Sequence, residues 1–329
     1  MKQEWINKLK KNRERTLSLL FYPALNLQAI KIKELFFSAI NQATTMKIIA
    51  DKCPLAGAVG IIDLSLEAEM LGAVYSFVEN KMPVIKKNII IDRIETLHVP
   101  AAGSGRDGIN IMAINKATTI IKDRPIFAVA TGPYSIANEL LGEAEITVAA
   151  YEKPQFLEIL MEKVTRYVND YIQKLKNAGA AGLIINDPAT SRASTEIAEK
   201  FSLRYLQRIC TANTDKDFVI IYHNSGNVIL LADAIAQVDA DIYYFGTGVD
   251  ILEMLKRMPK HKVVMGNLDP YNFVTESPAS VAHATQNLLM RCDEHENFVP
   301  AIGGIIPHDA AWDNIMAFFA TLEVYLPSK

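Results

Sequence analysis

The sequence predicts an α/β protein, a closed (β/α)8 TIM barrel, and three observations favour this fold. Eight apolar, strand-sized runs recur along the 329 residues, and a helical pattern follows each of them. The run at 218–223 is apolar without alternation, which indicates a strand buried on both faces of a parallel sheet. Most runs end on Gly, Asn, Asp or His, at the strand ends where barrels carry their chemistry. A doubly wound open sheet is the alternative, but no Gly-x-Gly-x-x-Gly turn follows the first strand.

The strands are predicted from runs rich in β-branched residues that a turn residue closes. They span 17–22, 56–62, 125–130, 181–185, 218–223, 241–245, 262–265 and 298–302. The helices are predicted from apolar positions at helical spacing. They span 27–52, 64–79, a segment from 135, 154–177, 194–212, 228–237, a short segment after 248, 278–293 and 310–325.

Two segments depart from this alternation. Residues 1–15 form a charged, amphipathic pattern, which predicts an N-terminal helix that packs on the barrel or covers its floor. Residues 81–124 are predicted as an insertion after the second β/α unit, with a hairpin or edge strand at 84–91 and a glycine-rich loop at 101–108. We expect one domain, 1–329, that contains both segments.

Composition narrows the function. The formal net charge of −3 gives no electrostatic reason to expect a nucleic-acid partner. Apolar stretches are strand-sized, so no membrane span is expected, and the basic N-terminus lacks the apolar core of a secretory signal. Three cysteines, none in a Cys-x-x-Cys spacing, favour a reducing cytoplasm over a disulfide framework.

In a barrel the carboxyl ends of the strands share one opening, which we call the mouth. The polar residues expected there are Asp63, Thr131, Asn186, Asp187, His223, Asn224, Ser225, Asn227, Thr247, Asn267 and Asp269. Asp63 and Asp187 would serve as acids or bases if burial raises their pKa values. The amides would suit a heteroaromatic or carboxylate-bearing ligand.

Structural roles compete with these assignments. Asp187 and Asp269 each precede proline, so a helix cap or a turn explains either one equally well. Asn227 and Asn267 lie beside glycine-containing turns, where a turn role is the default, whereas a functional role is favoured for His223. No second metal ligand lies near His223 in sequence, and the Gly-x-Ser-x-Gly pattern of a serine nucleophile is absent.

Five segments, in order and spacing, resemble the uroporphyrinogen decarboxylase superfamily from about residue 55 onward, with its methylcobamide:coenzyme M methyltransferases closer than the true decarboxylases. They are 63–72 (DLSLEAEMLG), 132–137 (GPYSIA), 186–189 (NDPA), 221–227 (IYHNSGN) and 265–270 (MGNLDP). The resemblance implies the same (β/α)8 barrel.

The resemblance also shows departures. In the methyltransferases it implies a zinc held by a histidine and two cysteines, which activates a thiol. Here His223 is the one candidate metal ligand, since Ser225 stands at the first cysteine position and Gly303 at the second, so zinc is not expected. For the decarboxylases the resemblance implies Asp63 as the catalytic aspartate. It also implies an arginine-bearing segment near the first strand, but residues 19–23 read LLFYP and contain no arginine, so a mouth without cations is expected.

The resulting hypothesis is a corrinoid-dependent methyltransferase-like enzyme that moves a methyl group from a methylcobamide, carried by a partner corrinoid protein, to a small thiol or pterin acceptor. Asp63, Asp187 and His223 are the predicted catalytic residues. The predicted ligand-binding residues are Asn186, Asn224, Ser225, Asn227 and Asn267. A tetrapyrrole decarboxylase and a non-catalytic corrinoid- or tetrapyrrole-binding protein are the alternatives, and a cytoplasmic homodimer is expected.

Overall fold

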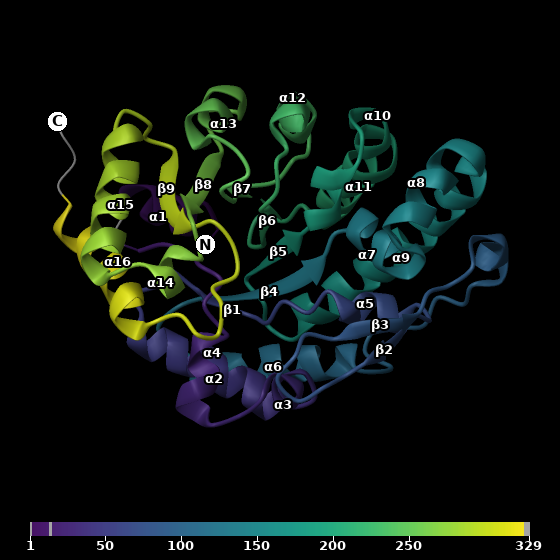
Figure 1. The fold of residues 1–329 in the computed structure, drawn as a ribbon, viewed down its shortest axis with the longest axis horizontal. Coiled ribbons are helices and arrows are strands. Elements are labelled where there is room, and N and C mark those ends of the chain that lie inside the picture. The colour runs from purple at the N-terminus through teal and green to yellow at the C-terminus, as the bar shows by residue number, and fades with distance from the viewer. Residues whose placement is uncertain (1, 13–14, 326–329) are drawn as a thin grey trace.

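A computed structural model describes residues 2–12 and 15–325, in which helices surround a curled parallel sheet (Figure 1). The strands are β1 (Ala58–Val59), β2 (Val74–Ser76), β3 (Val84–Lys87), β4 (Ile126–Thr131), β5 (Gly182–Asn186), β6 (Val219–Asn224), β7 (Ile242–Phe245), β8 (Val263–Leu268) and β9 (Phe298–Ile302). The α-helices are α1 (Lys2–Lys11), α2 (Pro23–Gln28), α3 (Ile32–Phe36), α4 (Ala39–Lys52), α5 (Ser65–Met70), α6 (Asp107–Ile120), α7 (Pro133–Leu141), α8 (Glu143–Glu152), α9 (Pro154–Asn177), α10 (Thr195–Ile197), α11 (Arg204–Asn213), α12 (Ala232–Ile235), α13 (Ile251–Arg257), α14 (Asn272–Thr275), α15 (Pro278–Arg291) and α16 (Trp312–Val324). Short 3-10 helices are η1 (Ile91–Thr96), η2 (Pro188–Arg192) and η4 (Ile229–Leu231), and η3 (Ala198–Leu203) is a π-helix.

The sheet runs β1-β4-β5-β6-β7-β8-β9, and every neighbouring pair is parallel. The first predicted strand, 17–22, does not form a regular strand, but it lies between β9 and β1. Leu19 makes a parallel bridge to Ile305, and the carbonyl of Thr16 accepts from the amide of Ala56 at 2.9 Å. The extended segment therefore takes the eighth position, and the predicted barrel fold is confirmed.

Side chains alternate between two apolar cores. On β4–β7, Val129, Ile184, Ile221 and Tyr244 belong to the cluster that fills the barrel, with Leu17, Leu19 and Phe21 from the first segment. Their sequence neighbours face the surrounding helices, which explains why these strands are apolar throughout. The residues two positions after Val129, Ile184 and Ile221 lie at the ends of their strands, and by the same alternation their side chains point into the mouth.

Two predicted helices are shorter than expected. The segment 27–52 is divided into α2, α3 and α4, because Ala29 has the left-handed φ of 53° and Ser38 caps the start of α4. The segment 64–79 ends as a helix at Met70, because Gly72 has φ 103° and the chain then enters the hairpin β2–β3. That hairpin begins before the predicted insertion, whereas α6, within it, packs against α4, α9 and β4 as part of the helical ring.

Helix α1 covers the amino end of the barrel. The Trp5 indole donates to the carbonyl of Ala56 at 2.9 Å, and its ring lies 4.8 Å from that of Phe127. A cavity of about 350 Å³ lies between α1 and the starts of β4–β6, at the end opposite the mouth. Among the residues that the structure describes, no helix is both long and apolar enough to span a membrane.

Candidate functional site at the barrel mouth

Thr131, Asn186, His223 and Tyr244 form one row across four strands. Thr131 pairs in register with Asn186, Asn186 with His223, and His223 with Tyr244. Because Val129, Ile184 and Ile221 face the barrel interior, the residues two positions later face it too. Asp63 follows the β1 segment directly after Ile61 and Ile62, which both belong to the cluster inside the barrel. We call Asp63, Thr131, Asn186 and His223 the polar layer.

His223 has a defined tautomer. Its Nδ1 lies 3.1 Å from the backbone carbonyl of Tyr244, and a carbonyl only accepts, so Nδ1 carries the proton. Burial lowers the pKa of His223 to about 4, so the ring is neutral near pH 7. Nε2 therefore has a free lone pair, and no side chain in the described part of the chain hydrogen-bonds to it. His223 can accept a proton or a hydrogen bond at the mouth.

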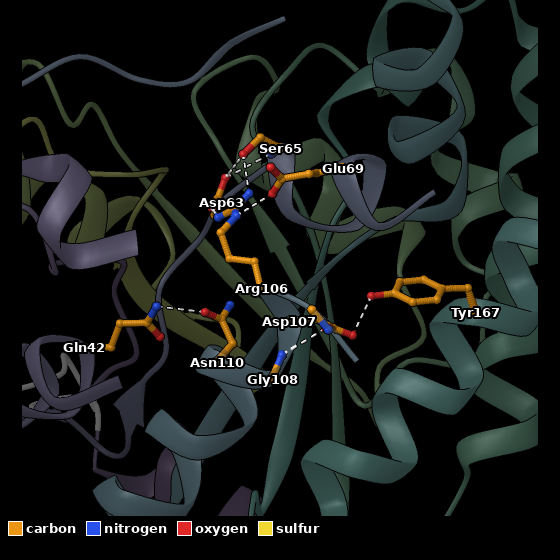
Figure 2. Close-up of polar contacts among 10 residues, drawn as sticks. Gln42, Asp63, Ser65, Glu69, Arg106, Asp107, Gly108, Asn110 and Tyr167 are labelled. Atoms are coloured by element: carbon orange, nitrogen blue, oxygen red, sulfur yellow. Dashed lines mark hydrogen bonds and ion pairs between the residues drawn. The ribbon is translucent and has the colours of Figure 1, made fainter. Parts of the chain in front are cut away.

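Asp63 is paired with a cation from a distant loop, Arg106, which Figure 2 shows reaching the Asp63 carboxylate. The other Asp63 oxygen accepts from the backbone N–H and the hydroxyl of Ser65, at 3.0 and 2.6 Å. Arg106 also donates through Nε to Glu69 at 2.5 Å and through Nη2 to the Ser65 hydroxyl at 2.8 Å. The expectation of a mouth without cations is therefore wrong.

Arg106 remains charged in this position. Burial by itself lowers the pKa of Arg106, but the charge of Asp63 and the hydrogen bonds to Asp63 and Glu69 outweigh burial, and the pKa is raised. One guanidinium thus faces two carboxylates.

The loop that presents Arg106 is held by the next residue. The buried Asp107 carboxylate accepts from the amides of Gly103, Gly105 and Gly108, at 2.6, 3.0 and 3.0 Å. It also accepts from the Tyr167 hydroxyl at 2.9 Å, as Figure 2 shows. Because three amides on both sides of Arg106 are tied to one carboxylate, the loop presents Arg106 in a fixed direction.

Glu67, on α5, is buried beside Thr131 of the polar layer. Its two oxygens accept from the backbone N–H and the hydroxyl of Thr131, each at 2.8 Å. Burial raises the pKa of Glu67 to about 7, although the bonds to Thr131 oppose this shift. Glu67 links α5 to the end of β4 and changes charge near neutral pH.

Asp187, predicted as an acid or base, is fully buried among donors. Its carboxylate accepts from the Ser135 hydroxyl at 2.6 Å, the Ser202 hydroxyl at 2.8 Å and the Thr190 hydroxyl. Ser202 comes from the π-helix η3, and Asn224 donates to the backbone carbonyl of Asp187 at 2.6 Å. These contacts favour a positioning role for Asp187 and Asn224 over contact with a ligand.

The remaining amides divide into two groups. Asn227 accepts from the amide of Ile229 at 3.2 Å, and Asn267 donates to the carbonyls of Gly246 and Val249 at 3.1 and 2.9 Å, so both stabilise turns. Asn186 lies in the polar layer, and its side-chain amide has no hydrogen bond within the described residues. Asn186 is therefore the amide best placed for a ligand.

The chain matches the family model described as uroporphyrinogen decarboxylase (URO-D) over residues 22–325. It belongs to the URO-D family. It is 26% identical over 282 residues to uroporphyrinogen decarboxylase from Dichelobacter nodosus, an alignment covering 83% of this chain and 80% of that protein. It is 24% identical over 234 residues to the methylcobamide:CoM methyltransferase MtbA from Methanosarcina acetivorans, covering 69% and 68%.

A solved methyltransferase from Methanosarcina mazei has the same fold as this URO-D family member. The two superpose with a TM-score of 0.86, covering 97% of this chain and 96% of that one, at 18% sequence identity. The sequence relatives thus include both a decarboxylase and a methyltransferase, and the fold is common to them.

The residues around His223 do not fit a zinc ion in this URO-D family member. Ser225 is exposed beside it, and across residues 2–12 and 15–325 no three His, Cys, Asp or Glu side chains gather as a metal would require. The structure also corrects the expected second position. A Cβ on Gly304 would lie 3.9 Å from the Cβ of Ser225, whereas one on Gly303 would meet the backbone of Gly246 at 3.0 Å.

Sequence reasoning missed Arg106 and Gly304. The one available signal for Arg106 was a single arginine within the glycine-rich loop 101–108, directly before a helix, and its partner Asp63 is 43 residues away. For Gly304, two adjacent glycines offered no reason in sequence to prefer one over the other.

Proposed function

We propose that the protein transfers a methyl group from a methylcobamide to a nitrogen acceptor of the pterin type. The observation that carries the proposal is the charge balance of the mouth: among the described residues Arg106 is the one cation that contacts the polar layer, and two carboxylates, Asp63 and Glu69, already face it. A uroporphyrinogen-type substrate bears many carboxylates, each of which needs a cationic partner. A small acceptor with N–H and amide groups suits Asp63, Asn186 and His223 better.

The environment of His223 supports nitrogen over sulfur as the acceptor atom. A thiol becomes a thiolate on a metal or with a base of sufficient strength. Ser225 and Gly304 offer no thiolate ligands for a metal beside His223, and burial lowers the pKa of His223 to about 4, which makes the ring too weak a base for a thiol. A methylcobamide supplies the methyl group and keeps the electron pair of the bond that breaks. The lone pair of the acceptor nitrogen forms the new bond to carbon, and that nitrogen then releases its proton. Asp63 and Nε2 of His223 are the proton acceptors that face the mouth.

The surroundings of the polar layer suit a flat, apolar macrocycle carried by a partner protein. Phe37 is 46% exposed, and its ring lies 4.8 Å from that of Phe77, whose face covers Arg106. Met82 is 43% exposed and accepts from the hydroxyl of Tyr22 at 3.0 Å. Exposed apolar side chains thus border the charged residues, which supports a corrinoid protein as the partner.

The test supplies methylcobalamin with tetrahydrofolate or with 2-mercaptoethanesulfonate, and follows demethylation by absorbance and the methylated acceptor by mass spectrometry. We expect methylation of tetrahydrofolate, and a loss of about 100-fold or more in His223→Ala and Asp63→Ala without unfolding. Glu162→Gln removes a carboxylate that pairs with Arg208 on the outer helices and serves as the matched control. Unchanged rates in both alanine variants would refute the assignment, and corrinoid binding without turnover would indicate a binding protein.

Decarboxylation is the second candidate, and Arg106 is the observation that favours it. An arginine beside Asp63 supplies one cationic partner in a mouth that was expected to have none. Release of carbon dioxide from a porphyrinogen, with no methyl transfer, would establish this alternative.

A further inference from the structure

The two carboxylates on Arg106 are held very differently. The Asp63 side chain is 3% exposed and also accepts two hydrogen bonds from Ser65. The Glu69 side chain is 31% exposed, and among the described residues Nε of Arg106 is its one side-chain partner. Asp63 is therefore held on the guanidinium by several contacts, whereas the Glu69 carboxylate has solvent beside it and can leave when another anion takes its place on Arg106.

Arg106 itself cannot follow Glu69 outward. Its guanidinium lies over the ring of Phe77 at 4.8 Å and over that of Phe37 at 5.6 Å, and its Nη2 donates to Ser65. Asp107 anchors the loop behind it. A guanidinium has five N–H donors, and Asp63, Ser65 and Glu69 use three of them. Two donors are unused, and Nε becomes available to a ligand when Glu69 leaves.

We propose that Arg106 binds the anionic group of the acceptor, a carboxylate or a sulfonate, and that Glu69 occupies this position until the ligand displaces it. The inference rests on the proposed function, and it adds that the acceptor carries an anionic tail. The exchange preserves charge, because one cation faces two anions before and after it. Without such a replacement, release of Glu69 would leave a buried guanidinium with unused donors, which is unfavourable.

The geometry favours a planar anion. Glu69 now occupies the side of the guanidinium that carries Nε. On this side an arginine donates two parallel hydrogen bonds to a carboxylate. The aromatic faces of Phe37 and Phe77 restrict the plane of that fork. A sulfonate can accept from the same donors with two of its three oxygens. The two anions therefore fit the same site, and their measured affinities distinguish them.

The experiment measures binding by isothermal titration calorimetry with 3-phenylpropionate and 2-phenylethanesulfonate, and with the neutral 3-phenylpropionamide as control ligand. If Glu69 competes with the ligand, Glu69→Gln binds both anions about 3- to 10-fold more tightly than the wild type. Arg106→Gln binds them at least about tenfold more weakly, and neither change alters amide binding. Glu162→Gln removes one negative charge elsewhere and leaves every affinity unchanged.

Equal or weaker anion binding by Glu69→Gln would overturn the inference, as would amide binding as tight as anion binding. Absence of anion binding in both the wild type and Glu69→Gln would overturn it too. If Arg106→Gln does not fold, Arg106→Lys takes its place. Lysine keeps the positive charge but lacks the two parallel N–H donors, so this variant is expected to bind the carboxylate no more tightly than the sulfonate. If the anions bind as expected but no methyl group is transferred, only the proposed function is refuted. If a methyl group is transferred but the Glu69 and Arg106 variants leave the anion affinities unaltered, only the inference is refuted.

Discussion

Glu67→Gln tests the reasoning about buried charge, because this carboxyl group changes protonation close to neutral pH. Both Glu67 oxygens face Thr131, one toward its N–H and one toward its hydroxyl. A glutamine keeps this arrangement: its carbonyl accepts from the N–H, and its amide group donates to the hydroxyl, which can accept. The variant therefore resembles the protonated form of Glu67 at every pH.

The magnitude follows from the raised pKa. The folded protein binds this proton up to a pKa of about 7, whereas the ordinary value is 4.5. Between pH 4.5 and pH 7 unfolding releases this proton. The contribution of Glu67 to the free energy of unfolding is therefore fully present below pH 4.5 and is lost as the pH rises to about 7. The difference in pKa corresponds to about 3 kcal/mol. Glu67→Gln does not lose this stability, so at pH 8 it should melt roughly 5 °C above the wild type.

The assay is thermal unfolding followed by circular dichroism, for wild type and variant, at several values between pH 5 and pH 8. The midpoint difference should be small at pH 5 and should grow until about pH 7, the folded-state value. Glu162→Gln is the matched control: the Arg208 hydrogen bond lowers the pKa of Glu162, so this group is ionised in the folded and the unfolded protein from pH 5 to pH 8, and the midpoint difference should stay constant with pH. A difference for Glu67→Gln that stays constant or shrinks with rising pH would refute a buried carboxyl with a raised pKa.

Two further predictions concern the loop and the region around His223. The Asp107 carboxylate accepts from four donors, two on each oxygen, and Asp107→Asn would set an NH2 group against two of these donors. This variant should lower the free energy of unfolding by about 3 kcal/mol, and Tyr167→Phe, which removes one donor, by about 1 kcal/mol. An Asp107→Asn variant with the melting temperature of the wild type would contradict this. Ser225→Cys with Gly304→Cys should bind zinc under reducing conditions by elemental analysis, because the two Cβ atoms would lie 3.9 Å apart. The pair Ser225→Cys with Gly303→Cys is the matched control, and zinc in this control alone would reverse the assignment of position 304.

Much of the fold was predictable because its signals are local. Continuous apolar runs identify β4–β9, and their alternation with helical patterns indicates a barrel before any contact is known. The first strand was harder to predict correctly. Leu17, Leu19 and Phe21 have the composition of a strand, but the segment reaches its neighbours through a bridge to Ile305 and a bond from Ala56.

The sequence by itself determined the fold class, the presence of Asp63, Asn186 and His223 at strand ends, and the absence of cysteine at positions 225, 303 and 304. These properties depend on residue type and position within one element. Only the tertiary structure decided which of these groups are available to a ligand: three hydroxyls hold Asp187, Asn267 closes a turn, and Arg106 reaches Asp63 across 43 residues. The physical reason is that the availability of a polar group depends on the donors and acceptors around it, and those come from segments far apart in the chain.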